Sequence, residues 1–248
     1  MPSLSTAQWL LAIAGALGMG ISKAGFPGMS LVHVVVFAFI FGARTSTGII
    51  LPMLIAADVW AVRAFRQHAQ WIYIRRMLPA ALVGVLLGFA LMGRLDESLF
   101  SPLIGTIVLL LILMQVVRMA RPGLFADVPH SRVFAWTMGL TAGVTTMVAN
   151  AAGPIFVLYA LSVGLPKYEL VGTGAMFFMI MNLAKVPLSA GLGLINPQTL
   201  FLNLVLLPVV FAGIAIGRRM TRHVPQRLFD GLLLAFAAVA ALRLVGAW

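Results

Sequence analysis

Two breaks rich in glycine and proline interrupt apolar segments of this chain and carry polar side chains. They are residues 23–28 (KAGFPG) and residues 150–154 (NAAGP). Proline suits the first turn of a helix, where its missing N–H has no partner to lose. Each break should therefore start a short helix whose free N–H groups and positive dipole end favour an anion. The sequence thus predicts an anion site built from the two breaks, with Lys23 as ammonium donor, Asn150 as amide donor, and backbone from Gly25, Pro27, Gly28, Gly153 and Pro154. The alternative is a pair of ordinary turns at a membrane surface, with Lys23 reaching water.

Two further charged residues lie inside apolar segments. Lys185 stands in residues 182–187 (NLAKVP), and Asp58 stands in the corresponding apolar segment of the first half of the chain. A lysine near the bilayer centre costs about 2.5–3.5 kcal/mol on insertion scales, so Lys185 should face a polar cavity or a partner. Asp58 could pair with Lys185, cap a helix, hydrogen-bond Arg63, or carry a proton during transport. The sequence leaves these four roles open.

The composition is that of a polytopic helical membrane protein. Of the 248 residues, 62% are hydrophobic and 9% are charged, and the mean hydropathy is +1.06. Such a chain cannot form a soluble domain of this size. The absence of cysteine excludes disulfides and thiol chemistry. The net charge of +11 indicates cytoplasmic loops that face anionic lipid, rather than a nucleic-acid partner. Residues 1–9 carry no basic residue, so the first apolar stretch should be structural and not a cleaved signal peptide.

Ten apolar segments are expected, five in each half of the chain. The first half (1–120) and the second half (131–248) are joined by a cytoplasmic linker (121–130). The expected segments are 7–23, 28–41, 44–65, 71–93 and 97–118, then 131–149, 154–165, 168–192, 197–220 and 225–247. The opening two of each half are short for a span of about 20 residues. A shift of 129 positions lays Pro79, Gly84 and Gly88 on Pro208, Gly213 and Gly217. This match predicts an internal repeat, and the poor residue alphabet of membrane helices is the competing explanation.

Basic residues orient the two halves. By the positive-inside bias, twelve of them should be cytoplasmic: Arg63, Arg66, Arg75, Arg76, Arg118, Arg121, Arg132, Lys167, Arg218, Arg219, Arg222 and Arg227. The uncharged loop 191–198 and the turn 94–97 should be outside. The halves are then inverted with respect to the membrane, both termini lie outside, and each opening pair is a hairpin of short or re-entrant helices. The repeated Gly-x-x-x-Gly spacing should pack helices closely and touch no substrate.

Enzymatic chemistry finds little support in the sequence. His33 has no second histidine, cysteine or carboxylate at ligand spacing, so it is interpreted as a packed residue. The Gly-x-Ser at 28–30 lacks the trailing glycine of a serine hydrolase motif. Paired carboxylates and a His-Glu-x-x-His run are also absent. We therefore expect neither catalysis nor a metal or cofactor.

The same motifs resemble the sulfite exporter TauE/SafE family over nearly the whole chain. The matching runs are residues 20–28 (GISKAGFPG), 51–58, 77–88, 146–154 (TMVANAAGP), 171–178 (VGTGAMFF) and 182–187. Two of these runs add Thr173 and Asn182 to the candidate substrate-binding residues. The resemblance implies a multi-pass permease of the bacterial inner membrane for small sulfur-containing anions such as sulfite, sulfoacetate or related organosulfonates. Many members have a Gly-rich run at 24–28 and a proline in place of His33, which leaves the substrate open.

The combined expectation is an all-α secondary transporter in the lipid bilayer. Its two inverted repeats would alternate access to an anion site near the bilayer midplane. The candidate substrate-binding residues are Lys23, Gly25, Pro27, Gly28, Asn150, Gly153, Pro154, Thr173, Asn182 and Lys185, with Asp58 as a candidate coupling residue. An anion channel on the same scaffold and a membrane enzyme or assembly factor are the alternatives. The oligomeric state is left open.

Overall fold

A computed structural model describes residues 4–24, 30–121, 131–220 and 226–246. Across these ranges the chain forms ten α-helices, with a 3-10 turn at Arg66–His68. The helices are α1 (Thr6–Lys23), α2 (Ser30–Phe41), α3 (Ala43–Phe65), α4 (Trp71–Arg94), α5 (Glu97–Ala120), α6 (Arg132–Ala149), α7 (Gly153–Ser162), α8 (Lys167–Gly191), α9 (Pro197–Met220) and α10 (Gln226–Val245). These bounds confirm the all-α class and the ten segments expected from the sequence. Of the linker 121–130, only Arg121 lies within the described residues.

Five of the described helices are long and apolar enough to cross a membrane. They are α3, α4, α5, α8 and α9, while α2 and α7 are shorter apolar helices. Large aliphatic side chains such as Leu86, Leu110 and Leu204 are more than half exposed on the outside of the bundle. Such a surface is stable only against lipid tails, so these side chains form the lipid-facing surface of a multi-pass membrane protein.

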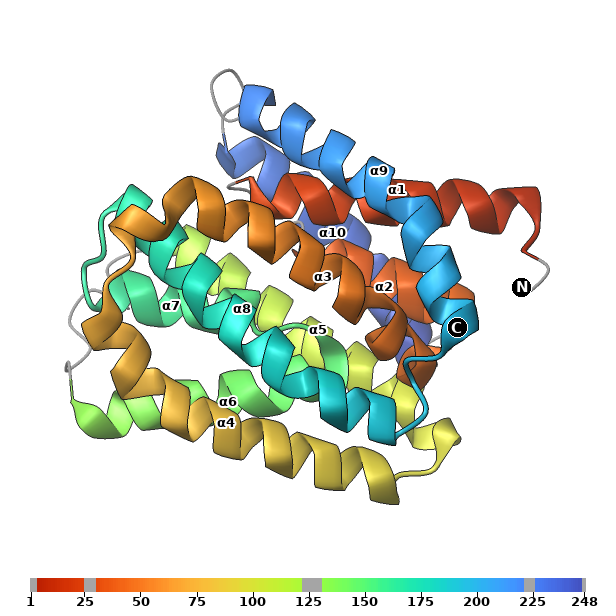
Figure 1. The fold of residues 1–248 in the computed structure, drawn as a ribbon, viewed down its shortest axis with the longest axis horizontal. Helices are drawn as coiled ribbons and strands as arrows, with labels where there is room; N and C mark the ends of the chain where they lie inside the picture. The colour runs from red at the N-terminus through yellow and green to blue at the C-terminus, as the bar shows by residue number, and fades with distance from the viewer. Residues whose placement is uncertain (1–3, 25–29, 122–130, 221–225, 247–248) are drawn as a thin grey trace.

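Helices pair between the two halves in a reciprocal way. In the order of the two halves, α1 corresponds to α6 and α4 corresponds to α9. Helix α4 packs extensively on α6, and its counterpart α9 packs extensively on α1. Helix α3 packs on α8, and α5 packs on α10, so each of these pairs maps onto itself. Figure 1 shows α1 beside α9 on one side of the molecule and α4 beside α6 on the other, with α3 and α8 between them. This pattern is what two related halves would produce, and their orientation in the bilayer stays a prediction.

The repeated glycines lie where two of these helix pairs touch. A Cβ placed on Gly84 of α4 would lie 2.2 Å from the carbonyl oxygen of Leu140 on α6. A Cβ placed on Gly213 of α9 would lie 2.2 Å from the carbonyl oxygen of Leu17 on α1. Both distances are far below van der Waals contact, so only glycine permits the approach. The packing role expected for these glycines is confirmed.

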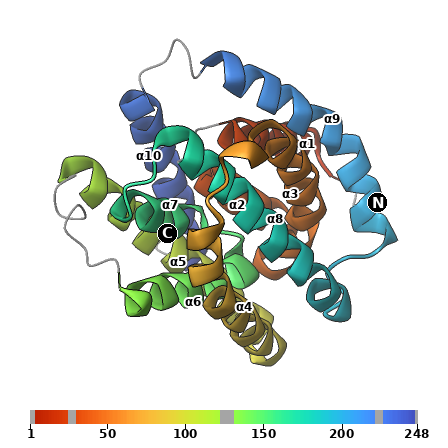
Figure 2. The same ribbon diagram turned by 60° about the vertical axis from the view of Figure 1, so that its left-hand side comes forward.

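Both opening helix pairs are antiparallel hairpins. In α6–α7, the ring of Phe134 at the start of α6 lies 6.0 Å from the ring of Tyr159 near the end of α7. In α1–α2, Gly15 lies against Phe37, and these two residues are similarly far from the turn. Figure 2 shows the two short helices α2 and α7 inside the bundle, surrounded by longer helices. The chain therefore enters and leaves each of these hairpins on the same side.

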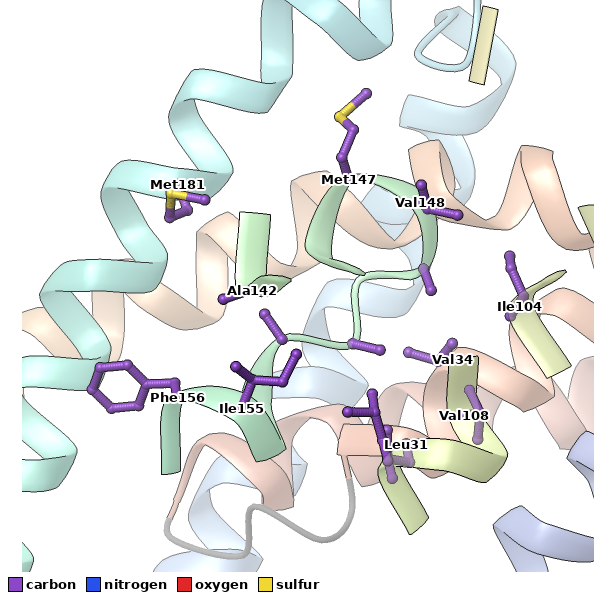
Figure 3. Close-up of a cluster of buried hydrophobic side chains, with 14 of the residues drawn as sticks. Leu31, Val34, Ile104, Val108, Ala142, Met147, Val148, Ile155, Phe156 and Met181 are labelled. Atoms are coloured by element: carbon purple, nitrogen blue, oxygen red, sulfur yellow. The ribbon is translucent and has the colours of Figure 1, made fainter. Parts of the chain in front are cut away.

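The break between α6 and α7 has a defined local cause. Helix α6 ends at Ala149, and its C-cap Asn150 has φ 52° and ψ 29°, the left-handed conformation that asparagine tolerates better than most residues. Pro154 lies in the first turn of α7, as expected for a residue without an N–H. Buried side chains from three other helices surround this break: Leu31 and Val34 of α2, Ile104 of α5, and Met181 of α8 (Figure 3). The break is therefore deep inside the bundle and not at its surface.

Candidate functional site

A cavity of about 420 Å³ lies among α1, α2, α3, α7 and α8. One part of its wall is polar and consists of Ser22, Lys23, Ser30, His33, Asp58, Thr146, Asn150 and Asn182. Another part is apolar and consists of Leu54, Phe156, Val157, Leu161, Leu165, Leu170, Val171 and Phe178. Arg118 of α5 and Lys167 at the start of α8 also line it. The cavity thus joins a polar group of residues to an apolar wall and a basic rim.

The polar wall is centred on an ion pair between Lys23 and Asp58. Lys23 is the last residue of α1, and its ammonium donates to Oδ1 of Asp58 on α3. The other carboxylate oxygen of Asp58 accepts a hydrogen bond of 2.7 Å from Nδ2 of Asn182 on α8. The Lys23 ammonium also lies 5.0 Å from the ring centre of Phe178. One buried carboxylate therefore holds three helices together, and its own charge is compensated.

Lys185 is buried behind this wall and has a different kind of environment. Its side chain is 1% exposed. Its ammonium donates to Oγ1 of Thr146 at 3.2 Å, to Oδ1 of Asn182 at 3.2 Å, and to Oδ1 of Asn150. These three neutral acceptors satisfy all three donors of an ammonium group. Among the described residues, Lys185 forms no direct ion pair, and the Asp58 carboxylate lies one amide side chain away from its ammonium.

Asn182 connects the two charged groups. Its amide nitrogen donates to Asp58, and its amide oxygen accepts from Lys185. The ion pair that the structure gives Asp58, with Lys23, is not among the four roles that the sequence left open. A single asparagine side chain separates its carboxylate from Lys185. The sequence did not predict the pairing of Asp58 with Lys23, although both residues stood out as charges in apolar surroundings.

The side-chain amide of Asn150 lines the cavity, but its hydrogen bonds are made to Lys185 and to the backbone of α3. Its oxygen accepts from Lys185, and its nitrogen donates to the backbone oxygen of Thr47 on α3 at 2.9 Å. Both ends of the amide are therefore engaged across helices. Thr146, which precedes Asn150 by four residues and so lies on the same helical face, is a site residue that sequence reasoning missed.

The first residues of α2 and α7 meet at the cavity. A Cβ placed on Gly153, the first residue of α7, would lie 3.0 Å from the hydroxyl oxygen of Ser30, the first residue of α2. Both residues line the cavity, so the N-termini of the two short helices lie side by side there. Pro154 is buried in the first turn of α7. Gly25, Pro27 and Gly28 lie outside the described residues.

Thr173 lies outside the cavity lining. Its hydroxyl accepts a hydrogen bond of 2.9 Å from the N–H of Gln70, just before α4, while its neighbours Gly174 and Ala175 line the cavity. His33 is buried and lines the cavity. In the described part of the chain, no group of three or more His, Cys, Asp or Glu side chains could hold a metal ion.

Comparison with known proteins identifies the family. The family model for the sulfite exporter TauE/SafE matches residues 10–244. The chain belongs to this family. It is also similar to the "Probable inner membrane transporter protein TsaS" of Comamonas testosteroni, with 30% identity over 166 residues, which are 65% of this chain and 66% of that protein. The match thus spans just under two thirds of the relative's length. No solved structure matches the chain.

The charges around the cavity of this TauE/SafE family member are mostly positive. Among the described residues, three cations (Lys23, Arg118 and Lys167) and one acid (Asp58) line it, and Lys185 lies directly behind the wall. A concave site with an excess of one sign of charge concentrates ions of the opposite sign. The described lining of the cavity therefore carries a net positive charge.

Proposed function

We propose that this protein is a secondary transporter of the bacterial inner membrane that moves small sulfur-containing anions. The observation that carries the proposal is the cavity itself, where Lys23 and the N-termini of two short helices lie together inside the membrane bundle. Interrupted helices at matching places of two halves are typical of transporter binding sites. The names of the family and of its relative from Comamonas testosteroni agree with transport. Catalysis has no support from the residues that line the cavity.

Within that class we favour organosulfonates over sulfite. The cavity of about 420 Å³ falls in the range of roughly 300–1,000 Å³ that is usual for organic ligands. An inorganic oxyanion would leave Phe156, Phe178 and the aliphatic side chains around them facing water. A sulfonate with a short apolar chain would place its head near Lys23 and cover this wall. The apolar wall therefore supports an anion with an organic body.

The position of Arg118 and Lys167 supports an inward-open state. Both line the cavity, and both belong to the basic residues that the positive-inside bias assigns to the cytoplasm. Lys185, Asn150 and Thr47 are joined by hydrogen bonds that connect α8, α6 and α3. Alternating access would then proceed by rocking of the two halves, which the reciprocal helix pairing supports.

The proposal can be tested with the purified full-length protein in lipid nanodiscs. Butanesulfonate, sulfite, sulfate and butyrate are compared by thermal unfolding, because a ligand of the native state raises the melting temperature. We expect the largest rise with butanesulfonate and its loss in Lys23→Met. Arg94→Met, which removes an exposed cation that does not line the cavity, serves as the matched control. A melting temperature that no anion changes would contradict the proposal, and non-saturating flux in proteoliposomes would favour a channel.

A further inference from the structure

We propose that Asp58 is an internal counter-anion, which the substrate displaces from Lys23 and which then pairs with Lys185. This inference rests on the proposed anion-transport function. In this proposal Lys23 contacts the substrate directly. Asp58 and Lys185 do not contact it, and they form a new ion pair when it binds. Four features of the site carry it: the exposure of Lys23, the lack of a direct ion pair at Lys185, the position of Asn182, and the charge count.

The first feature is the exposure of the Lys23–Asp58 pair. The Lys23 side chain is 17% exposed, whereas Asp58 is 0% exposed. An anion that enters the cavity therefore reaches the ammonium of Lys23 and not the carboxylate behind it. The Asp58 carboxylate already occupies this ammonium, so the substrate must compete with it. Asp58 thus holds the place that the substrate's anionic head would take.

The second feature is Lys185, which is buried with three neutral acceptors. A buried charge without a directly paired opposite charge is costly, even when its hydrogen bonds are made. Lys185 therefore gains more from a carboxylate partner than a solvated lysine would. Asp58 can reach it with little movement, because Asn182 already binds Asp58 with its nitrogen and Lys185 with its oxygen. A shift of Asp58 past this amide would bring the two charges together.

The charge count decides where the displaced carboxylate goes. The described cluster holds two ammonium groups, Lys23 and Lys185, and one carboxylate, Asp58. Arg118 and Lys167 form the basic rim of the cavity. Among the described residues that line it, Asp58 is the one acid. A monoanion at Lys23 raises the number of negative groups to two. If Asp58 stayed in place, its carboxylate and the substrate would compete for Lys23. If Asp58 moves to Lys185, each ammonium group has one anionic partner.

The exchange also links substrate binding to the contact between the halves. The Lys23–Asp58 pair connects α1 and α3, both from the first half of the chain. A pair between Asp58 and Lys185 would connect α3 with α8, which comes from the second half and packs against α3. Substrate binding would therefore replace an ion pair within one half by an ion pair between the halves. Asp58 would in this way couple occupancy of the site to the relative position of α3 and α8.

The test measures butanesulfonate affinity by calorimetric titration of full-length variants. Asp58→Asn removes the competitor and should bind about tenfold more tightly, as expected when a charged hydrogen-bond competitor is lost. Lys185→Met leaves Asp58 without a second partner and should bind about tenfold more weakly or not at all. The double variant Asp58→Asn with Lys185→Met should regain at least the affinity of the wild type, because no carboxylate then competes for Lys23.

A second double variant controls for net charge. Asp58→Asn with Lys23→Met has the same formal charge as the rescued variant but lacks the ammonium that contacts the substrate, so it should not bind. Size-exclusion chromatography and thermal unfolding establish that each protein is folded. If Lys185→Met is not rescued by Asp58→Asn, Lys185 contacts the substrate directly and the exchange is wrong. Unchanged affinity in Asp58→Asn alone would overturn it equally. A wild-type protein that binds no anion would instead contradict the proposed function.

Discussion

Lys185 of α8 donates a hydrogen bond to the side-chain oxygen of Asn150, so a buried lysine binds the C-cap residue of α6. The same asparagine donates to the Thr47 carbonyl of α3. Asn150 therefore connects the break between α6 and α7 to two long helices, one from each half. This relationship makes Asn150 important both for the backbone at the break and for the position of Lys185.

Two substitutions separate these contributions of Asn150. Asn150→Ala and Asn150→Gly both remove the hydrogen bonds to Lys185 and Thr47 and should lower the melting temperature. Alanine also pays for the left-handed backbone, which costs about 1–2 kcal/mol, whereas glycine does not. We therefore expect Asn150→Gly to be the more stable of the two by roughly 1 kcal/mol in thermal unfolding. Equal stability would mean that the backbone relaxes out of the left-handed conformation.

The glycine contacts between α4 and α6 predict opposite effects for two alanine substitutions on one helix. Gly84→Ala would place a Cβ 2.2 Å from the Leu140 oxygen, so the helices must separate. We expect a loss of about 1–3 kcal/mol, the usual cost of overpacking. Gly93→Ala is the matched control, because no heavy atom lies within 4 Å of its Cβ position. Its stability should stay unchanged or rise in the same thermal measurement, since alanine is the better helix former.

The cavity opening can be mapped with introduced thiols, because the chain has no cysteine. Val171→Cys places a thiol on the cavity lining, and Leu204→Cys places one on the lipid-facing surface. A membrane-impermeant maleimide should label Val171→Cys in inside-out vesicles, and butanesulfonate should slow the reaction. Leu204→Cys should react slowly in either orientation and be indifferent to the ligand. Fast labelling of Val171→Cys only from the periplasmic side would contradict an inward-open cavity.

The inverted arrangement predicts the location of four reporter fusions. A reporter in the loop 193–197 and one at the C-terminus should be periplasmic, whereas reporters at Gln67 and Pro122 should be cytoplasmic. The reason is the distribution of arginine and lysine along the chain. Paired alkaline phosphatase and fluorescent-protein fusions at each site provide the measurement. A cytoplasmic 193–197 loop would favour parallel repeats instead.

Local sequence was sufficient to predict the described helices and the break between α6 and α7. Runs of apolar residues gave helix bounds close to those observed, because a membrane segment must satisfy its backbone hydrogen bonds internally. Pro154 and the Gly-x-x-x-Gly spacing could also be interpreted correctly, since proline at a helix start and glycine at a helix contact act through local geometry. The family resemblance rests on the same local motifs. These features depend on residues near one another in the chain.

Only the tertiary structure decided which polar groups are partners. Lys23 pairs with Asp58 although 35 positions separate them, and Asn182 reaches Asp58 across 124 positions. Thr173, predicted at the site, instead binds the Gln70 backbone across 103 positions and lies outside the cavity lining. The packing of α1, α3, α6 and α8 determines which charged and polar side chains form pairs. Hydrophobic periodicity determines that a helix is buried, but it carries little information on the rotation and depth that bring particular side chains together.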